Sequence, residues 1–188
     1  PLARMRAPAG NGEELGADGR RELDLIAGAA ELLGYRMEWY RHRATKGDFL
    51  ILAERPDLPS KGRGTIVRRL TGGRPFVVEV PHPGLEVTSF EYGISLFARL
   101  QARYLVIAGS SPKANLDGTA DVLRPENKAS LFNLAHSVIL REAGAEPPLV
   151  VQSRGFAPAG PSGRALPDGL VATLDGTVRR DALSPLSA

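Results

Sequence analysis

The spacing of apolar residues along the chain predicts a helix near its beginning. Over residues 18–34, apolar side chains recur at intervals of three and four, and a glycine closes the stretch. This spacing is typical of an amphipathic helix. The positions expected on its apolar side are Leu23, Ile26, Ala30 and Leu33.

Four stretches of strand length follow this helix. The last of them, RPFVVEVP, has a continuous Phe-Val-Val core, which favours a strand buried on both faces. The other three alternate apolar and polar residues or run apolar, and residues typical of turns separate them. The predicted strands cover 35–42, 48–54, 62–70 and 74–81.

Helical and extended patterns then alternate along the rest of the chain. We predict a helix over 86–101, a strand over 103–109, a helix from about 126 to 142 and a strand over 148–156. This order predicts an α/β fold, a three-layer sandwich with a mixed, partly parallel sheet between helices. The apolar side of the helix at 86–101 comprises Phe90, Ile94, Phe97 and Leu100.

The ends of the chain differ in composition from the part between them. Residues 1–17 are rich in Pro, Gly and Ala and predict a flexible leader, whereas 18–156 predict a single α/β domain. Residues 157–188 are a Pro/Gly-rich extension with one predicted strand, GLVATLDG, which we expect to cover a sheet edge or to contact another chain. Because the chain starts at Pro1, the sequence leaves open whether the protein is cytoplasmic or is exported after removal of an upstream segment.

Composition and charge exclude several classes of protein. With 188 residues, 43% of them hydrophobic, the chain can bury one core, and its 24 basic and 21 acidic residues are spread along its length. We therefore expect no nucleic-acid partner, which would need a basic stripe. No apolar stretch reaches the roughly 18 residues of a membrane span, so we expect a soluble protein. With no cysteine, any metal site depends on histidine and carboxylate ligands.

A histidine and a glutamate follow the most apolar predicted strand. His82 comes directly after this strand and Glu86 follows four residues later. Ligands of α/β sheets bind at the carboxyl ends of strands, where these two side chains would form part of a zinc site. The alternative is a stiff turn, Pro81-His82-Pro83-Gly84, with Glu86 stabilised by the dipole of the next helix.

His136 and the polar loop at 110–127 provide further candidates. His136 shares the apolar side of its predicted helix with Phe132 and Ile139, so it is either a metal ligand or a core histidine with one hydrogen-bond partner. In and just after the loop, Arg124 and Lys128 are basic residues suited to holding a substrate carboxylate. The alternative is a loop that supplies only turns and a helix cap.

Three stretches taken in order carry a resemblance to a known family. They are VEVPHPGLEVTSFEYGISLFARLQARYLVIAG, the polar loop after it, and LVVQSRGF, all within about residues 62–156. Together they resemble the core of the zinc-carboxypeptidase-like superfamily, which has a phosphorylase/hydrolase-like fold and includes N-formylglutamate amidohydrolases and poly-γ-glutamate hydrolases. The resemblance implies zinc held by His82 and Glu86, and hydrolysis of an amide bond beside a carboxylate that Arg124 binds.

The sequence departs from this family at residue 154. Such enzymes commonly have a further metal-binding histidine at the end of the late strand, where this chain has Arg154. A guanidinium cannot ligate zinc, so His136 would have to be the third ligand. Arg154 is instead expected to pair with Glu86, replacing the metal by charge-assisted hydrogen bonds, or to contact substrate.

Two functions are consistent with these residues. The first is a catalytically silent relative of metal-dependent amidohydrolases that contains no cofactor and acts as a binding or structural component. The second is a zinc-dependent hydrolase that cleaves an amide or peptide bond next to a carboxylate. The expected partners are a small carboxylate-bearing or peptide ligand, or a protein partner, which includes a second copy of the chain.

Overall fold

The computed structural model describes residues 17–43, 46–124, 126–128 and 130–155, together with 173–174 and 177–178. Of the predicted leader over 1–17, only Ala17 is among them, and the rest lies outside the described residues. The chain divides into two units, residues 1–155 and 156–188.

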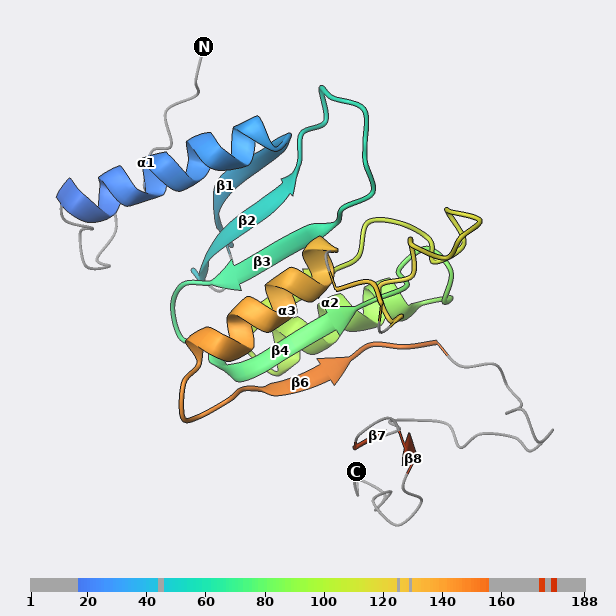
Figure 1. The fold of residues 1–188 in the computed structure, drawn as a ribbon. Helices are drawn as coiled ribbons and strands as arrows, with labels where there is room; N and C mark the ends of the chain where they lie inside the picture. Colours follow the sequence, from blue (N-terminus) through green and yellow to red (C-terminus); the bar gives the residue numbers. More distant parts are fainter. Residues whose placement is uncertain are drawn as a thin grey trace, which may run out of the picture. The chain divides into compact units, whose positions relative to one another are not determined.

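In its described residues, the first unit has an α/β fold, as predicted, with three helices and one open, mixed sheet of six strands (Figure 1). Its helices and strands alternate in the second half of the unit, as the sequence pattern indicates. In chain order the elements are α1 (Ala17–Leu32), β1 (Tyr35–Arg41), β2 (Asp48–Glu54), β3 (Thr65–Arg69), β4 (Arg74–Val80), α2 (Ser89–Arg99), β5 (Ala102–Ile107), α3 (Leu131–Glu142) and β6 (Leu149–Gln152).

The strands lie in the order β1-β2-β3-β5-β4-β6. The first three strands form an antiparallel meander, and β3 is also antiparallel to β5. In contrast, β4 is parallel to both of its neighbours, β5 and β6. The parallel half of the sheet is therefore centred on β4.

The connection that follows β4 and the connection that follows β5 run in opposite directions along the order of strands in the sheet. The chain passes from β4 through α2 to the neighbouring strand β5, and then from β5 through α3 back past β4 to β6. Such a reversal is a topological switch point, and loops at the carboxyl ends of the strands diverge there to leave a crevice. The residues after β4, β5 and β6 meet at this end of the sheet.

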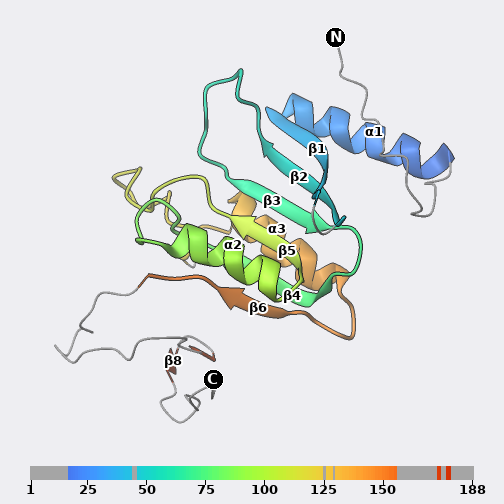
Figure 2. The same ribbon diagram turned by 180° about the vertical axis from the view of Figure 1, so that it is seen from behind.

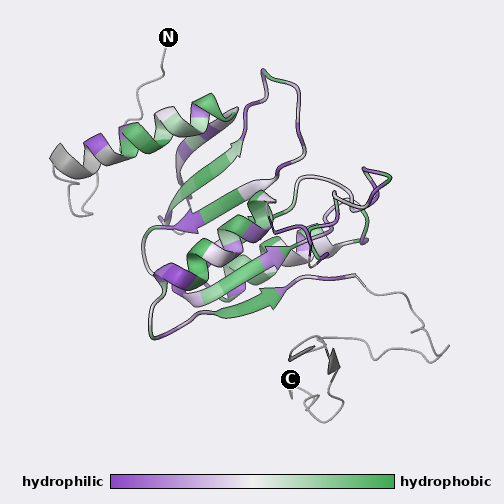
Figure 3. Cartoon of the chain, viewed as in Figure 1, coloured by the Kyte–Doolittle hydropathy of each residue, from purple (hydrophilic) through white to green (hydrophobic). Residues whose placement is uncertain are grey.

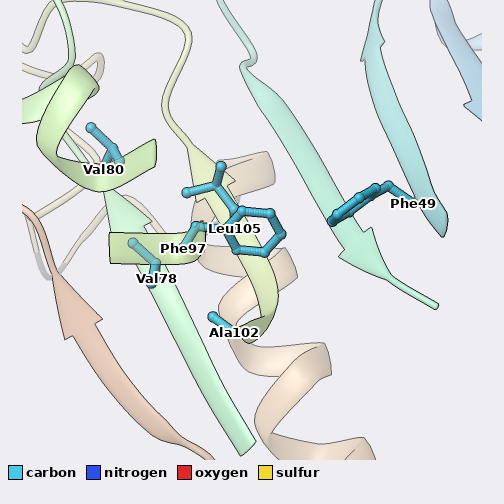
Figure 4. Packing of buried hydrophobic residues seen from close by; sticks show 6 residues of the cluster. All are labelled: Phe49, Val78, Val80, Phe97, Ala102 and Leu105. Atoms are coloured by element: carbon cyan, nitrogen blue, oxygen red, sulfur yellow. The ribbon is translucent and has the colours of Figure 1, made fainter. Parts of the chain in front are cut away.

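The core packs against both faces of β4. Val78 and Val80 belong to one apolar cluster with Phe97 of α2, which Figure 4 shows. Val77 belongs to a second cluster with Phe132 of α3. Because side chains alternate along a strand, the two clusters lie on opposite faces of β4, and Figure 2 shows the sheet from the side of α2. The prediction that β4 is buried on both faces is confirmed.

Two helices begin later than the sequence pattern predicts. α2 begins at Ser89, not at residue 86, because Thr88 before it has a left-handed backbone with φ of 65°. α3 begins at Leu131, not near residue 126, because Ser130 is its N-cap and accepts a hydrogen bond from the backbone N–H of Asn133. The chain between residues 82 and 88 is thus a turn that is free to present side chains.

The apolar sides of α1 and α2 are covered only in part by the described residues. In α1, Ala30 is buried but Ile26 is 48% exposed, and Leu33, just after the end of α1, is 63% exposed. In α2, Phe97 is buried, whereas Phe90 and Ile94 are exposed. Figure 3 shows hydrophobic positions along both helices. None of the helices in the described part of the chain is long and apolar enough to span a membrane.

The second unit contains two short antiparallel strands, β7 (Thr173–Leu174) and β8 (Thr177–Val178). The strand predicted over residues 169–176 includes β7. Its remaining residues, and the rest of the extension over 157–188, lie outside the described residues.

Candidate functional site

Five residues from three loops meet at the carboxyl ends of the parallel strands. His82 and Glu86 follow β4, Asp121 belongs to the loop after β5, and Arg154 and Gly155 follow β6. We call these residues the Glu86 cluster. Its position confirms that the ends of these strands bring polar side chains together.

Glu86 is the centre of this cluster. Its carboxylate accepts hydrogen bonds from Arg154, Nε at 2.9 and 3.1 Å and Nη2 at 2.7 Å, and from the backbone N–H of Gly155 at 2.7 Å. The side chain of Glu86 is only 10% exposed and that of Arg154 is 28% exposed. The predicted pairing of Arg154 with Glu86 is confirmed, and it is a charge-assisted pair largely shielded from water.

His82 joins this ion pair to the loop after β5. Its Nδ1 lies 2.9 Å from Oε1 of Glu86, and its Nε2 lies 3.0 Å from Oδ1 of Asp121. An imidazolium can donate to both carboxylates at once, whereas a neutral imidazole can donate to only one. In either state of the ring, each nitrogen of His82 lies against a carboxylate.

Local backbone geometry holds Glu86 in place. The backbone N–H of Glu86 donates to the carbonyl of His82, and the Ser89 hydroxyl donates to the carbonyl of Glu86. A Cβ at residue 155 would lie 2.8 Å from Cβ of Glu86, so only glycine fits there without displacing the carboxylate. Thr88, a β-branched residue with positive φ, marks a strained turn beside the cluster.

Hydrogen bonding lowers the pKa of both carboxyl groups in the cluster. Burial acts to raise the pKa of Glu86, but hydrogen bonds, first that of Arg154, outweigh it and hold this pKa below the ordinary 4.5. Burial likewise acts to raise the pKa of Asp121, but hydrogen bonds from His82 and from the N–H of Leu123 hold it below 3.8. The cluster therefore keeps two carboxylates charged at neutral pH.

Acid should destabilise the domain through Glu86. Because the pKa of Glu86 is lower in the folded than in the unfolded chain, its stabilisation is fully present above about pH 4.5 and is lost as pH falls through the lowered value. We expect the thermal unfolding temperature to fall between about pH 5 and pH 3, and to fall less in a Glu86→Gln variant. Equal decreases in the two proteins would show that another group is responsible.

A second polar cluster lies on the face of β4 that α3 covers. Glu79 of β4 is fully buried, and its carboxylate lies 2.6 Å from Nδ1 of His136 and accepts a hydrogen bond from Nε2 of Gln152 at 3.0 Å. We call these three residues the Glu79 cluster. The hydrogen bond with Glu79 raises the pKa of His136 above 6.5, although burial opposes the shift. A buried carboxylate needs such partners to be stable in the core.

A pocket of about 400 Å³ opens beside the Glu79 cluster. Arg124 and Lys128 line it together with Asn133 of α3 and the residues of that cluster. Arg124 also lines a neighbouring pocket of about 510 Å³, bounded by the polar loop. Figure 3 shows the hydrophilic residues of this loop. The two basic residues predicted to hold a substrate therefore lie at one pocket.

The predicted site residues fall into two groups. His82 and Arg154 both contact Glu86, while Arg124, Lys128 and His136 line the pocket. His136 contacts Glu79, as expected of a core histidine with one partner. Among the described residues, no hydrogen bond or ion pair joins His136 to His82 or Glu86.

Sequence reasoning missed Glu79 and Gln152 and did not assign Asp121 to His82. The signal for Glu79 is present: a single glutamate interrupts the apolar run FVVEV, and a charge there needs a buried partner. The contact between His82 and Asp121 spans 39 residues, and no local pattern encodes it.

The residues as placed do not fit a zinc ion. Both nitrogens of His82 contact carboxylates, and a permanent cation, Arg154, lies against Glu86. In the described part of the chain, no group of three or more His, Cys, Asp or Glu side chains is arranged to hold a metal ion. Zinc binding by His82, Glu86 and His136 would require these contacts to break.

Comparisons with known proteins do not assign the chain to a family. No protein-family model matches it, and searches of curated proteins and of solved structures find no match either. Its function therefore has to be inferred from the arrangement of its own residues.

Proposed function

We propose that this chain is a binding component that works without a metal, a catalytically silent relative of metal-dependent amidohydrolases. The observation that carries the proposal is the pairing of Arg154 with Glu86. The guanidinium supplies beside Glu86 the positive charge that a metal ion supplies in a hydrolase, but it cannot activate water as a Lewis acid.

The ligand proposed for this component is a small anionic molecule, such as one bearing a carboxylate or a short peptide. Support comes from Arg124 and Lys128, which line the same pocket beside α3. A protein partner or a second copy of the chain is the alternative for a structural role.

We also propose that helices cover both faces of the sheet in three layers, supported by the clusters that Phe97 and Phe132 form on opposite faces of β4.

A zinc-dependent hydrolase of amide or peptide bonds is the second candidate. One observation favours it: His82 lies within 3.0 Å of the carboxylates of both Glu86 and Asp121, and histidine and carboxylate are ordinary zinc ligands. The candidate requires Arg154 to leave Glu86 so that a metal ion can take its place.

The metal content of the protein distinguishes the two functions. We would purify the chain without chelators or a histidine tag and measure metals by elemental mass spectrometry, with a His82→Ala variant as control. The expected result is no bound zinc, even after zinc is added back. Near-stoichiometric zinc that disappears in His82→Ala would overturn the proposal and favour the hydrolase, whose activity would then be tested on amide substrates.

An Arg154→His variant tests the same proposal from the opposite direction. If the arginine replaces a metal ligand, a histidine at residue 154 places an imidazole beside Glu86 and His82, and we expect this variant to bind zinc. An Arg154→Gln variant removes the charge without adding an imidazole and is expected to bind none. Equal zinc contents of the two variants would contradict the replacement.

A further inference from the structure

The pocket beside α3 contains basic side chains with few partners in the described part of the chain. Arg124 donates one long hydrogen bond, 3.3 Å, to the carbonyl of Asp117. No ion pair between described residues includes Arg124 or Lys128, and both residues are exposed. Their charges are available to a ligand in the pocket.

Three acidic groups near the pocket have partners of their own, whereas the exposed Glu126 lines the neighbouring pocket. The carboxylate of Glu79 contacts His136 and Gln152, and that of Asp121 contacts His82. The carboxylate of Asp117 accepts hydrogen bonds from Thr119. Among the residues that line the pocket, Arg124 and Lys128 carry two positive charges against the one carboxylate of Glu79, and His136 adds a positive charge when its ring is protonated.

Hydrogen bonds hold the loop that carries the basic residues. The side-chain amide of Asn133 in α3 donates to the carbonyls of Val122 and Asn127, each at 2.7 Å. Asn127 in turn donates to the carbonyl of Asp121 at 3.1 Å. The backbone on both sides of Arg124 is therefore fixed before a ligand binds, which lowers the entropic cost of binding.

We propose that this pocket binds a small organic dianion, held by Arg124 and Lys128, with Asn133 and the Glu79 cluster as its wall. The inference rests on the proposed binding function and names the class of its ligand. A volume of about 400 Å³ lies in the range of small-molecule sites. Two permanent cations match two negative charges, whereas a single carboxylate is satisfied by one guanidinium. A phosphate monoester and a dicarboxylate share this chemistry.

Calorimetric titration tests the proposal with three probes, phenyl phosphate, succinate and acetate, in buffer containing EDTA. We expect saturable binding of at least one dianion, about tenfold tighter than that of acetate. Tighter binding of phenyl phosphate would identify a phosphate ligand, and tighter binding of succinate a dicarboxylate. Because the chelator removes metal ions, this result is independent of the zinc measurement, and either proposal can fail alone.

Variants locate the binding to the pocket. Lys128→Ala and Arg124→Ala should each weaken dianion binding by about tenfold. Lys113→Ala, a change of the same type at an exposed lysine in the same loop outside the pocket, should leave it unchanged. Unchanged unfolding temperatures would show that the variants stay folded. The proposal is overturned if neither dianion binds, if acetate binds equally well, or if Lys113→Ala weakens binding as much as Lys128→Ala.

Discussion

Replacing Arg154 with alanine is expected to lower the free energy of unfolding by about 2–4 kcal/mol. The change removes three hydrogen bonds from a carboxylate that is only 10% exposed. Breaking a buried ion pair from one side is costly, because the remaining charge stays shielded from water without its partner. For a domain of this size, the unfolding temperature should fall by roughly 5–15 °C.

Two further variants separate this effect from a general loss of charge. Arg141 is paired with Glu142 on the surface, and its side chain is 73% exposed, so Arg141→Ala should change stability little. Arg154→Lys keeps the charge but loses the planar fork and should fall between wild type and Arg154→Ala. If Arg154→Ala unfolds at the same temperature as Arg141→Ala, the pair with Glu86 contributes nothing measurable and the central observation behind the proposed function is lost.

The elements that the sequence predicts well are those with a strong local pattern. The apolar run from Phe76 to Val80 predicts a strand buried on both faces because every residue of such a strand must be apolar or paired. The late starts of α2 and α3 were not predicted, because they depend on the positive φ of Thr88 and on the cap at Ser130. Neither feature alters the periodicity of apolar residues.

The part of the candidate site that could be predicted is the proximity of residues that follow the parallel strands. Residues after parallel strands meet at one end of a sheet, so the proximity of His82, Glu86 and Arg154 follows from the order of elements. The chemistry of Arg154 also follows from its residue type, since a guanidinium beside a glutamate pairs with it. The partner of His136 did not follow, because the pairing of β4 with β6 and the position of α3 decide which buried group faces it.

The two clusters respond to pH in opposite directions. Glu86 stabilises the domain only while it is charged, so its contribution disappears in acid. The pKa of His136 is raised by Glu79, so the stabilisation from this pair is fully present below about pH 6.5 and is lost as pH rises through the raised value. The domain should be most stable between these two limits.

The pair of Glu79 with His136 gives the second large expected effect. Replacing His136 with alanine leaves a carboxylate that is 1% exposed with Gln152 as its remaining hydrogen-bond partner among the described residues. We expect the free energy of unfolding to fall by about 2–3 kcal/mol, less than for a fully buried pair because the His136 side chain is 35% exposed. Urea unfolding near pH 6 measures the change.

A double-mutant cycle shows whether this loss belongs to the pair. Glu79→Gln removes the charge while keeping the shape, so His136→Ala should cost less in that background than in the wild type. The coupling energy should decline as pH rises, since His136 loses its proton, and NMR titration should show the pKa of His136 decreasing toward 6.5 in Glu79→Gln. Additive losses and an unchanged pKa would mean that Glu79 and His136 are neighbours in the core without electrostatic coupling, and His136 would then contribute no extra positive charge to the pocket.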